Sequence, residues 1–488
     1  MQTKLPMKKI IKVISLFLLY HTSSFAQFVT FEKTYQFFPA NQEAVKQVIT
    51  TKDGGYALRT VTSYVSAFDP IYAGVIKLDS MGNKQWEYHF ILGLDTRSDF
   101  LLETNDNGLL ISGVTPTDTG IGNYDLWLLK LDSVGQIEWY NKITAQNWVY
   151  TVNEIITLNN GDFIISTNGY SKSNIVVIDS LGTLISWNSY NNLSFIRGLQ
   201  LKNDSLLFAT AARDTTLNRF FMSYILMKTN GSILSTTLWN YELDSVFVAI
   251  GNSAGTLNKH SEAICNGAIL NSVGNWEGYV MKFDSTGNCT ISKKLSLDRT
   301  FLIDKIISPN SGGGFVLAGG LSSSNPGLGS GWIYILDDFC DSVSFKFIGN
   351  AANKPSIFYD VKQCSDSGFI AVGLYVPNTT EVPYAVKVDK NGNLNNFLGK
   401  NNQADVQSEL TIYPNPSNEF TYFLKNNISE NAQLTISTVA GQLLFETILK
   451  NSNEAVKVST SHFPNGFYIC KIKNANGFAQ SKKLLVIH

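Results

Sequence analysis

Apolar and polar positions along the chain form a repeated pattern of short β-strands and tight turns. In Leu126–Trp139, LWLLKLDSVGQIEW, a bulky apolar run enters an Asp-Ser-Val-Gly turn and leaves it in an alternating run. The first run is typical of a buried strand, and the alternation at Ile137 and Trp139 is typical of a half-exposed one. Asp132 can hydrogen-bond its own backbone, and Gly135 can adopt the positive φ that closes a hairpin. The stretch therefore predicts a β-hairpin.

The same phrase returns with a period near 50 residues. Its turn falls at Asp79, Asp132, Asp179, Thr229, Asp284, Asp337 and Asp389. A second phrase, in which Gly or Asn separates two strands, precedes several of these turns, as in TNDNGLLISGV from Thr104 and CSDSGFIAVGL from Cys364. Four short strands at this period are the signature of propeller blades. The seven copies predict an all-β chain with a seven-bladed β-propeller.

The ends of the repeat array predict how the ring closes. Phe28–Phe38 is an isolated strand that precedes the first blade, and the last blade has a poor, Asn-rich outer strand at Asn393–Phe397. We expect the N-terminal strand to complete the last blade, because this removes an exposed strand edge. The blades are then expected to begin near Ala44, Ser98, Val152, Phe195, Val246, Leu302 and Phe358.

The N-terminus has the pattern of a secretory signal peptide over residues 1–26. A lysine-rich region precedes the apolar stretch Val13–Tyr20, and small residues at Ser24 and Ala26 predict cleavage between Ala26 and Gln27. The apolar stretch is too short to span a bilayer as an anchor. We expect no membrane-spanning segment after the signal is removed.

The C-terminal part changes character after a polar stretch at residues 397–408 that is typical of a linker. Residues 27–396 form the predicted propeller, and residues 409–488 contain short strands separated by turn signals at Pro414, Pro416 and Gly441. Asn-Gly turns follow at Asn465 and Asn476. This pattern predicts a small immunoglobulin-like antiparallel β-sandwich.

Charge and reactive residues exclude several chemistries. The formal charge of −1 gives no basic field for nucleic acid. The cysteines and histidines have no zinc-site spacing, and the sequence has no GxSxG, HExxH or P-loop motif. We therefore expect no metal, no cofactor and no identifiable catalytic residue, and we favour a protein that is not an enzyme. A bridge between Cys340 and Cys364 and a set of free buried thiols both stay open.

The loops between the second and third strands of the blades vary in length and share one face of a propeller, which is where binding residues are usually found. The candidate binding residues are aromatic residues of these loops: Tyr64, Tyr124, Trp276, Trp332 and Tyr384. The alternative is that several of these residues begin third strands and pack between blades. A mechanism that uses only carboxylates would draw on the loop acids Asp69, Asp118, Asp125 and Glu381.

Two resemblances add to this interpretation. The stretch NYDLWLLKLDSVGQIEWYNKI at Asn123–Ile143 resembles the β-propeller repeats of secreted bacterial proteins, sometimes called SBBP repeats. In the C-terminal part, four motifs occur in order: YPNP at Tyr413–Pro416, VAGQLL around Gly441, PNGFYICKI with Gly466 and Tyr468, and SKKLLVI with Lys483. The YPNP motif comprises Tyr413, Pro414, Asn415 and Pro416.

These C-terminal motifs resemble the type A sorting domain of the type IX secretion system of Bacteroidota. The resemblance implies a partner in the secretion machinery, passage through the periplasm, and a secreted or cell-surface location. The Asp-Ser-apolar turns at Asp79, Asp132, Asp179 and Asp284 also fit the short O-glycosylation pattern of this bacterial group, although turn chemistry alone accounts for their Asp and Ser.

Together these observations favour a binding or adhesion module for an unknown surface glycan or protein. A secreted hydrolase with carboxylates on the propeller face is the first alternative. A structural part of a surface assembly is the second.

Overall fold

The structure is a computed structural model in which the following residues are described: 29–35, 42–63, 73–90, 97–117, 124–144, 149–169, 172–191, 193–202, 205–214, 219–228, 232–239, 248–249, 256–258, 260, 262–270, 276–284, 288–295, 301–309, 314–321, 331–348, 355–377, 380–394, 409–426, 431–450, 455–474 and 479–488. These residues form strands and turns, which confirms the predicted all-β class. No helix among them is long and apolar enough to cross a membrane. The expected cleavage site at Ala26 and Gln27 and the expected linker lie outside the described residues.

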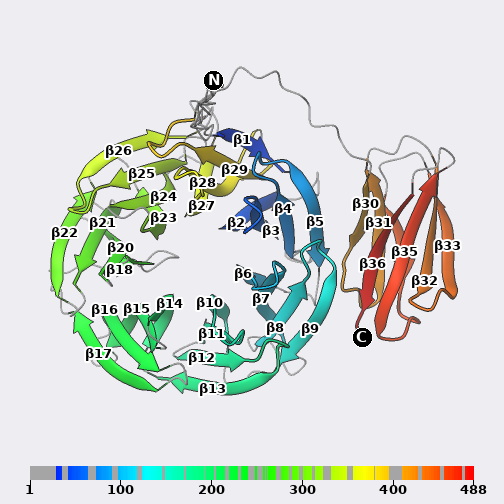
Figure 1. Ribbon diagram of the computed structural model, residues 1–488, viewed down its shortest axis with the longest axis horizontal. Helices are drawn as coiled ribbons and strands as arrows, with labels where there is room; N and C mark the ends of the chain where they lie inside the picture. Colours follow the sequence, from blue (N-terminus) through cyan, green and yellow to red (C-terminus); the bar gives the residue numbers. More distant parts are fainter. Residues whose placement is uncertain are drawn as a thin grey trace, which may run out of the picture.

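Seven antiparallel sheets form a ring, and their first strands face its middle (Figure 1). The first three blades are β2 (Gln42–Thr50), β3 (Tyr56–Ser63), β4 (Ala73–Leu78) and β5 (Lys84–Phe90); β6 (Arg97–Glu103), β7 (Leu109–Pro116), β8 (Tyr124–Leu131) and β9 (Ile137–Ile143); and β10 (Thr151–Thr157), β11 (Phe163–Asn168), β12 (Ser173–Ile178) and β13 (Leu184–Tyr190). The next two are β14 (Leu193–Lys202), β15 (Ser205–Asp214), β16 (Arg219–Lys228) and β17 (Ile233–Trp239); and β18 (Val248–Ala249), β19 (Thr256–Leu257), β20 (Ala263–Leu270), β21 (Trp276–Phe283) and β22 (Cys289–Leu295). The last two are β23 (Phe301–Ile307), β24 (Phe315–Leu321), β25 (Trp332–Leu336) and β26 (Ser342–Phe347); and β27 (Ser356–Gln363), β28 (Phe369–Tyr375) and β29 (Val382–Val388), completed by β1 (Phe31–Thr34).

The N-terminal strand closes the ring, as the sequence predicts. β1 pairs antiparallel with β29, with Phe31 opposite Lys387 and Thr34 opposite Tyr384. The Lys387 ammonium also donates a hydrogen bond to the carbonyl of Val29 at 2.6 Å. The first and last parts of the propeller therefore share one sheet, which leaves no unpaired edge at β29.

The hairpin turns have the predicted chemistry. Asp132 Oδ1 accepts hydrogen bonds from the N–H groups of Val134 at 3.0 Å and Gln136 at 2.7 Å, and Gly135 has a φ of 81°. Asp79, Asp179, Asp337 and Asp389 accept the same pair of hydrogen bonds. The serines of three such turns, Ser80, Ser133 and Ser180, are exposed. Their O-glycosylation stays a hypothesis.

The glycines of these turns also have a packing role that explains why Gly and Trp recur together. A Cβ atom on Gly135 would lie 2.9 Å from the ring of Trp86, which belongs to the outer strand of the preceding blade. A Cβ on Gly182 would lie 2.7 Å from the ring of Trp139 in the same way. At these two turns the glycine therefore provides the flat surface on which the Trp ring of the preceding blade packs.

The C-terminal residues form two facing sheets. The first contains β30 (Glu409–Tyr413), β31 (Phe420–Asn426) and β34 (Val456–Ser459), and the second contains β33 (Leu443–Leu449), β32 (Ala432–Thr438), β35 (Gly466–Asn474) and β36 (Ala479–Val486). Asn415 of the YPNP motif is buried and accepts a hydrogen bond from the N–H of Leu485 at 2.8 Å. Its side-chain amide donates to the carbonyl of Lys483 at 2.7 Å. The first motif therefore holds the closing motif in place.

The remaining motif residues of this part have structural places too. Tyr468 donates a hydrogen bond from its hydroxyl to the carbonyl of Pro464, at 2.5 Å. Gly441 and Gly466 have φ angles of 87° and 151°, which residues other than glycine rarely adopt. The sandwich lies against the outer strands of the first two blades (Figure 1), and Leu485 belongs to the same apolar cluster as Phe90.

The cysteines with described side chains are free thiols. Cys289 is exposed, and Cys340, Cys364 and Cys470 are buried. Cys340 and Cys364 belong to different apolar clusters, so the bridge between them that the sequence left open is not formed. Cys340 occupies the turn position that glycine takes in other blades, with a φ of 59°.

Candidate functional site

Bulges in the inner strands place a set of side chains in the middle of the ring. The pairing register shifts near the start of six inner strands. The extra residue at this shift is Lys46, Asp99, Asn153, Phe195, Asp304 or Tyr359. A bulge leaves its extra residue outside the ladder and redirects its side chain. All of these residues except Phe195, whose side chain is not described, line one cavity. The repeated bulge therefore brings these side chains together in the cavity.

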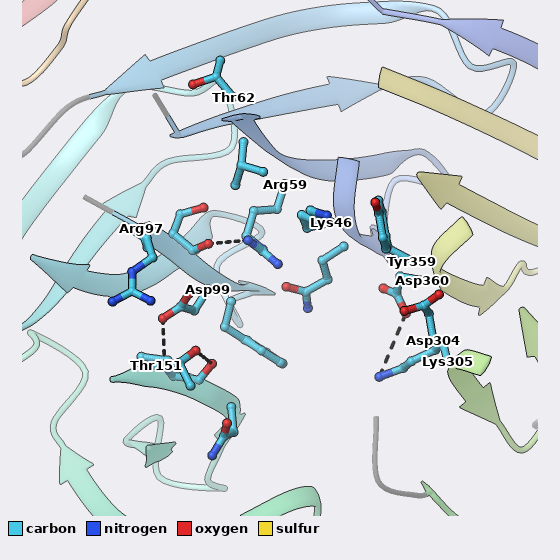
Figure 2. Close-up of a pocket in the computed structure, with 16 residues that line it drawn as sticks. Lys46, Arg59, Thr62, Arg97, Asp99, Thr151, Asp304, Lys305, Tyr359 and Asp360 are labelled. Carbon is cyan, nitrogen blue, oxygen red and sulfur yellow. Dashed lines mark hydrogen bonds and ion pairs between the residues drawn. The ribbon is translucent and has the colours of Figure 1, made fainter. Parts of the chain in front are cut away.

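The cavity has a volume of about 390 Å³ and is lined by residues from five blades (Figure 2). Besides the bulge residues, its polar lining includes Arg59, Thr62, Arg97, Thr151, Lys305 and Asp360. It lies toward the face that carries the variable loops, because the bulges are near the start of each inner strand. Gln42 at the start of β2, for example, pairs with Ser63 at the end of β3, where the loop begins.

Lys46, Asp304 and Tyr359 form one side of the cavity. The Lys46 ammonium lies 3.3 Å from the centroid of the Tyr359 ring. Burial and the nearby charge of Arg59 lower the pKa of Lys46 to about 8, although Asp304 and Glu381 act in the opposite direction. Burial raises the pKa of Asp304 to about 7, against the effect of Lys46. This side of the cavity therefore holds an acid and a base that both titrate near neutral pH.

Two arginines form the other side. The Arg59 guanidinium is buried and donates a hydrogen bond to the carbonyl of Ser98. Burial lowers the pKa of Arg59 to about 10, while Asp99 and Asp360 act to raise it. The Arg97 guanidinium lies over the ring of Tyr124, with 4.6 Å between its central carbon and the ring centroid. Figure 2 shows both guanidinium groups beside Asp99.

Several buried polar atoms of the lining have no hydrogen-bond partner among the described residues. They are the Nε atoms of Arg59 and Arg97, the hydroxyl of Ser98, and both polar atoms of the Asn153 amide. Buried polar atoms of native proteins nearly always have a partner, and an unfilled one marks a place for water or a ligand. The cavity therefore concentrates hydrogen-bonding capacity that the protein itself does not use.

Two of the three carboxylates in the lining have a structural role. Asp99 Oδ2 accepts the N–H of Val152 in the next blade at 2.9 Å, and Asp360 Oδ2 accepts the N–H of Val48 at 3.0 Å. Gln47 bridges blades in a similar way, through Leu101. These side chains fasten neighbouring inner strands to each other. Asp304 is the third carboxylate of the lining, and burial raises its pKa to about 7.

The structure distributes the aromatic candidates differently from the sequence-based expectation. Tyr124 lies next to the cavity through its contact with Arg97. Trp332 and Tyr384 are not part of a rim, because their exposed fractions are 0% and 2%. Both belong to third strands, β25 and β29, whose side chains pack against neighbouring blades, so the alternative interpretation holds for them. Tyr64 and the side chain of Trp276 lie outside the described part of the chain.

The loop acids do not gather at the cavity where they are described. Asp125 is buried and lies 3.1 Å from the ammonium of Lys142, and Glu381 is not a lining residue. Asp69 and Asp118 lie outside the described residues. The acids that do line the cavity, Asp99, Asp304 and Asp360, were missed. In β23 and β27 the Asp interrupts an apolar run, which does not by itself reveal a bulge, and Asp99 follows the polar residues Arg97 and Ser98.

Metal-binding geometry does not occur in the part of the chain that the structure describes, since no group of three or more His, Cys, Asp or Glu side chains there could hold an ion. The lining can therefore offer charge, hydrogen bonds and an aromatic face to a ligand.

Comparisons with known proteins place the C-terminal part in a family. Residues 411–487 match the family described as "Secretion system C-terminal sorting domain". No curated protein matches the chain.

Among solved structures, the chain is similar to a PL25 ulvan lyase, with a TM-score of 0.47 and 10% identity over 74% of this chain and 97% of that one. It is also similar to the β-propeller domain of the Trilobed protease from Pyrococcus furiosus, with a TM-score of 0.42 and 8% identity over 74% and 98% of the two chains. A protein of unknown function from Bacteroides caccae gives a TM-score of 0.36 and 11% identity over 58% and 91%.

Proposed function

We propose that this protein, which its sorting domain directs through the type IX secretion system to the cell surface or the extracellular space, binds a glycan in the cavity of its propeller. The observation that carries the proposal is the set of buried polar atoms without partners around the cavity, above all the amide of Asn153. A bound ligand would supply the hydrogen bonds that these atoms lack.

The lining suits a sugar better than an apolar ligand. The Asn153 amide offers an NH2 group that can donate and a carbonyl oxygen that can accept, so sugar hydroxyls can pair with it in both directions. Thr62 and Thr151 add hydroxyl groups, and Tyr359 adds an aromatic ring. The cavity volume of about 390 Å³ falls in the range of roughly 300–1,000 Å³ that small-molecule sites occupy. Because the lining side chains stand on strands, the site is held rigidly.

A hydrolase remains the second candidate, and Asp304 is the residue that favours it. A carboxyl group whose pKa burial raises to about 7 can act as a general acid at neutral pH. Glycoside hydrolysis also needs a second carboxylate. Asp99 and Asp360 are already bound to backbone N–H groups, so binding without turnover is the function that we favour.

The test is binding of the full secreted chain to a glycan array, followed by calorimetry with each glycan that is retained. We expect Asn153→Ala to weaken binding by tenfold or more. Asn391→Ala is the matched control, because Asn391 is exposed in a hairpin turn on the opposite face, and we expect it to bind as the wild type does. Failure of the folded protein to retain any glycan, or equal binding by both variants, would overturn the proposal. Release of shortened glycan would favour the hydrolase.

A further inference from the structure

The position of Arg97 points to an acidic ligand. We propose that the glycan carries a carboxylate, as a uronic acid residue does, and that the Arg97 guanidinium binds this carboxylate in the cavity. This inference rests on the proposed function and names the chemical class of its ligand.

The first argument is the way in which Arg97 is held. Its guanidinium lies over the Tyr124 ring, at 4.6 Å from the centroid, and the Tyr124 ring lies 6.2 Å from that of Tyr150. The carbonyl of Arg97 accepts a hydrogen bond from the indole of Trp127 at 3.2 Å, which fixes the backbone. A guanidinium that stacks on a ring keeps its in-plane N–H donors available, and their fork matches both oxygens of a carboxylate.

The second argument is that one of these donors, the Nε–H of Arg97, is not used by the protein. The Nε of Arg97 is buried and has no hydrogen-bond partner among the described residues. The charges of Arg59 and Arg97 act on the carboxylate of Asp99, whose Oδ2 accepts a hydrogen bond from the N–H of Val152. A guanidinium whose buried Nε–H has no partner can donate a charge-assisted hydrogen bond to a ligand carboxylate.

The third argument is the charge of the lining. Four cationic side chains, those of Lys46, Arg59, Arg97 and Lys305, face three acids, those of Asp99, Asp304 and Asp360. The cavity is therefore net cationic in a protein whose formal charge is −1. Burial raises the pKa of Asp304 to about 7 and lowers that of Lys46 to about 8, so it favours the neutral form of one acid and of one base and leaves the excess of cationic side chains in place. A concave site focuses such a field on an anionic ligand.

A glycan is favoured over an acidic peptide because of what lies beside Arg97. Asn153 presents an amide donor and acceptor without partners, and Thr151 presents a hydroxyl. These groups match the hydroxyls that surround the carboxylate of a uronic acid residue. The apolar members of the lining are Val61, Phe100 and Val152.

The test compares acidic glycans with copies in which the acid is masked. The full secreted chain is titrated with oligogalacturonate, oligoglucuronate and oligomannuronate, with their methyl esters, and with polyglutamate. We expect at least one oligouronate to bind tenfold or more tightly than its ester, with an affinity that falls as salt is added. Arg97→Gln should remove most of this preference, because it should weaken binding of the acid far more than binding of the ester. Arg97→Lys should keep part of it.

Tyr124 provides a second variant, which acts through Arg97. Tyr124→Phe keeps the ring under the guanidinium and should preserve the preference for acid, whereas Tyr124→Leu should reduce it. Thermal melts of all variants check folding. Equal binding of an oligouronate and its ester would overturn this inference while leaving glycan binding intact. A wild-type preference unchanged in Arg97→Gln would also overturn it. Binding of polyglutamate without any oligouronate would replace the glycan by an acidic peptide, and binding of no glycan at all would overturn the proposed function itself.

Discussion

Asp360, in the inner strand of the last blade, accepts the backbone N–H of Val48, in the inner strand of the first blade, at 3.0 Å. The two residues are 312 positions apart in the sequence. The same contact joins Asp99 to Val152 at 2.9 Å between the second and third blades. The join between the first and last blades is therefore fastened at the inner strands by a carboxylate and at the outer edge by β1.

Replacing Asp360 should destabilise this join. Asp360→Ala leaves the buried N–H of Val48 without an acceptor, and an unsatisfied buried donor costs about 1–3 kcal/mol. Asp360→Asn keeps an acceptor oxygen and should cost less. Urea unfolding of the secreted chain, followed by fluorescence, measures both changes. Asp360→Ala with the stability of the wild type would show that this hydrogen bond contributes little.

Glu87 should make the protein sensitive to acid. Burial alone would raise its pKa, but the charge of His89, whose Nε2 lies 3.9 Å from the carboxylate, and the ion pair with Lys84 at 2.9 Å outweigh burial and lower the pKa to about 2. An unfolded Glu has a pKa of about 4.3. The charged form therefore stabilises the fold above about pH 4.3, and this contribution is lost as the pH falls toward about 2.

The measurement is the free energy of unfolding of the wild type and of Glu87→Gln from pH 7 to pH 2. We expect the wild type to be more stable at pH 7 and the difference to shrink between about pH 4 and pH 2. A difference that does not change with pH would contradict the assignment.

Two glycine variants separate backbone conformation from packing. Gly54 and Gly135 have φ angles of 82° and 81°, so an alanine at either position costs about 1 kcal/mol for its conformation. Only at Gly135 would the new Cβ meet a ring, that of Trp86 at 2.9 Å, while nothing lies within 4 Å at Gly54. We expect Gly135→Ala to be the more destabilising by about 1–3 kcal/mol in chemical unfolding. Equal losses would mean that Trp86 moves aside without cost.

The thiols should differ in reactivity in the folded protein. Burial raises the pKa of Cys340 and of Cys364 to about 11, and it raises the pKa of Cys470 as well. Cys289 is exposed and should be alkylated first by iodoacetamide, while these three stay protected until the protein is unfolded. Mass spectrometry of the native and the unfolded protein counts the labels. A pair that resists alkylation after unfolding without reductant would reveal a disulfide.

Local turn chemistry made the architecture predictable. Each copy of the Asp-x-x-Gly turn forms its hairpin from its own residues, so its position could be found without knowing the rest of the fold. The same holds for β1, because an orphan strand at one end of the chain and a poor outer strand at the other end require each other. The observed pairing of Phe31 with Lys387 follows from that need.

The site was not predictable in the same way, because it depends on a register shift. Lys46, Asp99 and Asp304 share a position only as bulge residues, and a bulge leaves no mark in a pattern of apolar and polar residues. The expected exposure of Trp332 and Tyr384 on the loop face was not found for a related reason. The first residues of third strands and the last residues of loops look alike in a sequence, and neighbouring blades decide which are buried.

The pairing of β1 with β29 limits where the chain can be truncated or tagged. Val29 and Lys387 are 358 positions apart, yet they meet in one blade. During synthesis β1 has no pairing partner until nearly the whole propeller has been made. A truncation that stops before Lys387 removes part of β29, so the strand edges at both ends of the open ring stay unpaired and can pair with other chains. A tag placed directly before Phe31 lies next to the pairing of β1 with β29, whereas a tag at the C-terminus lies away from that pairing.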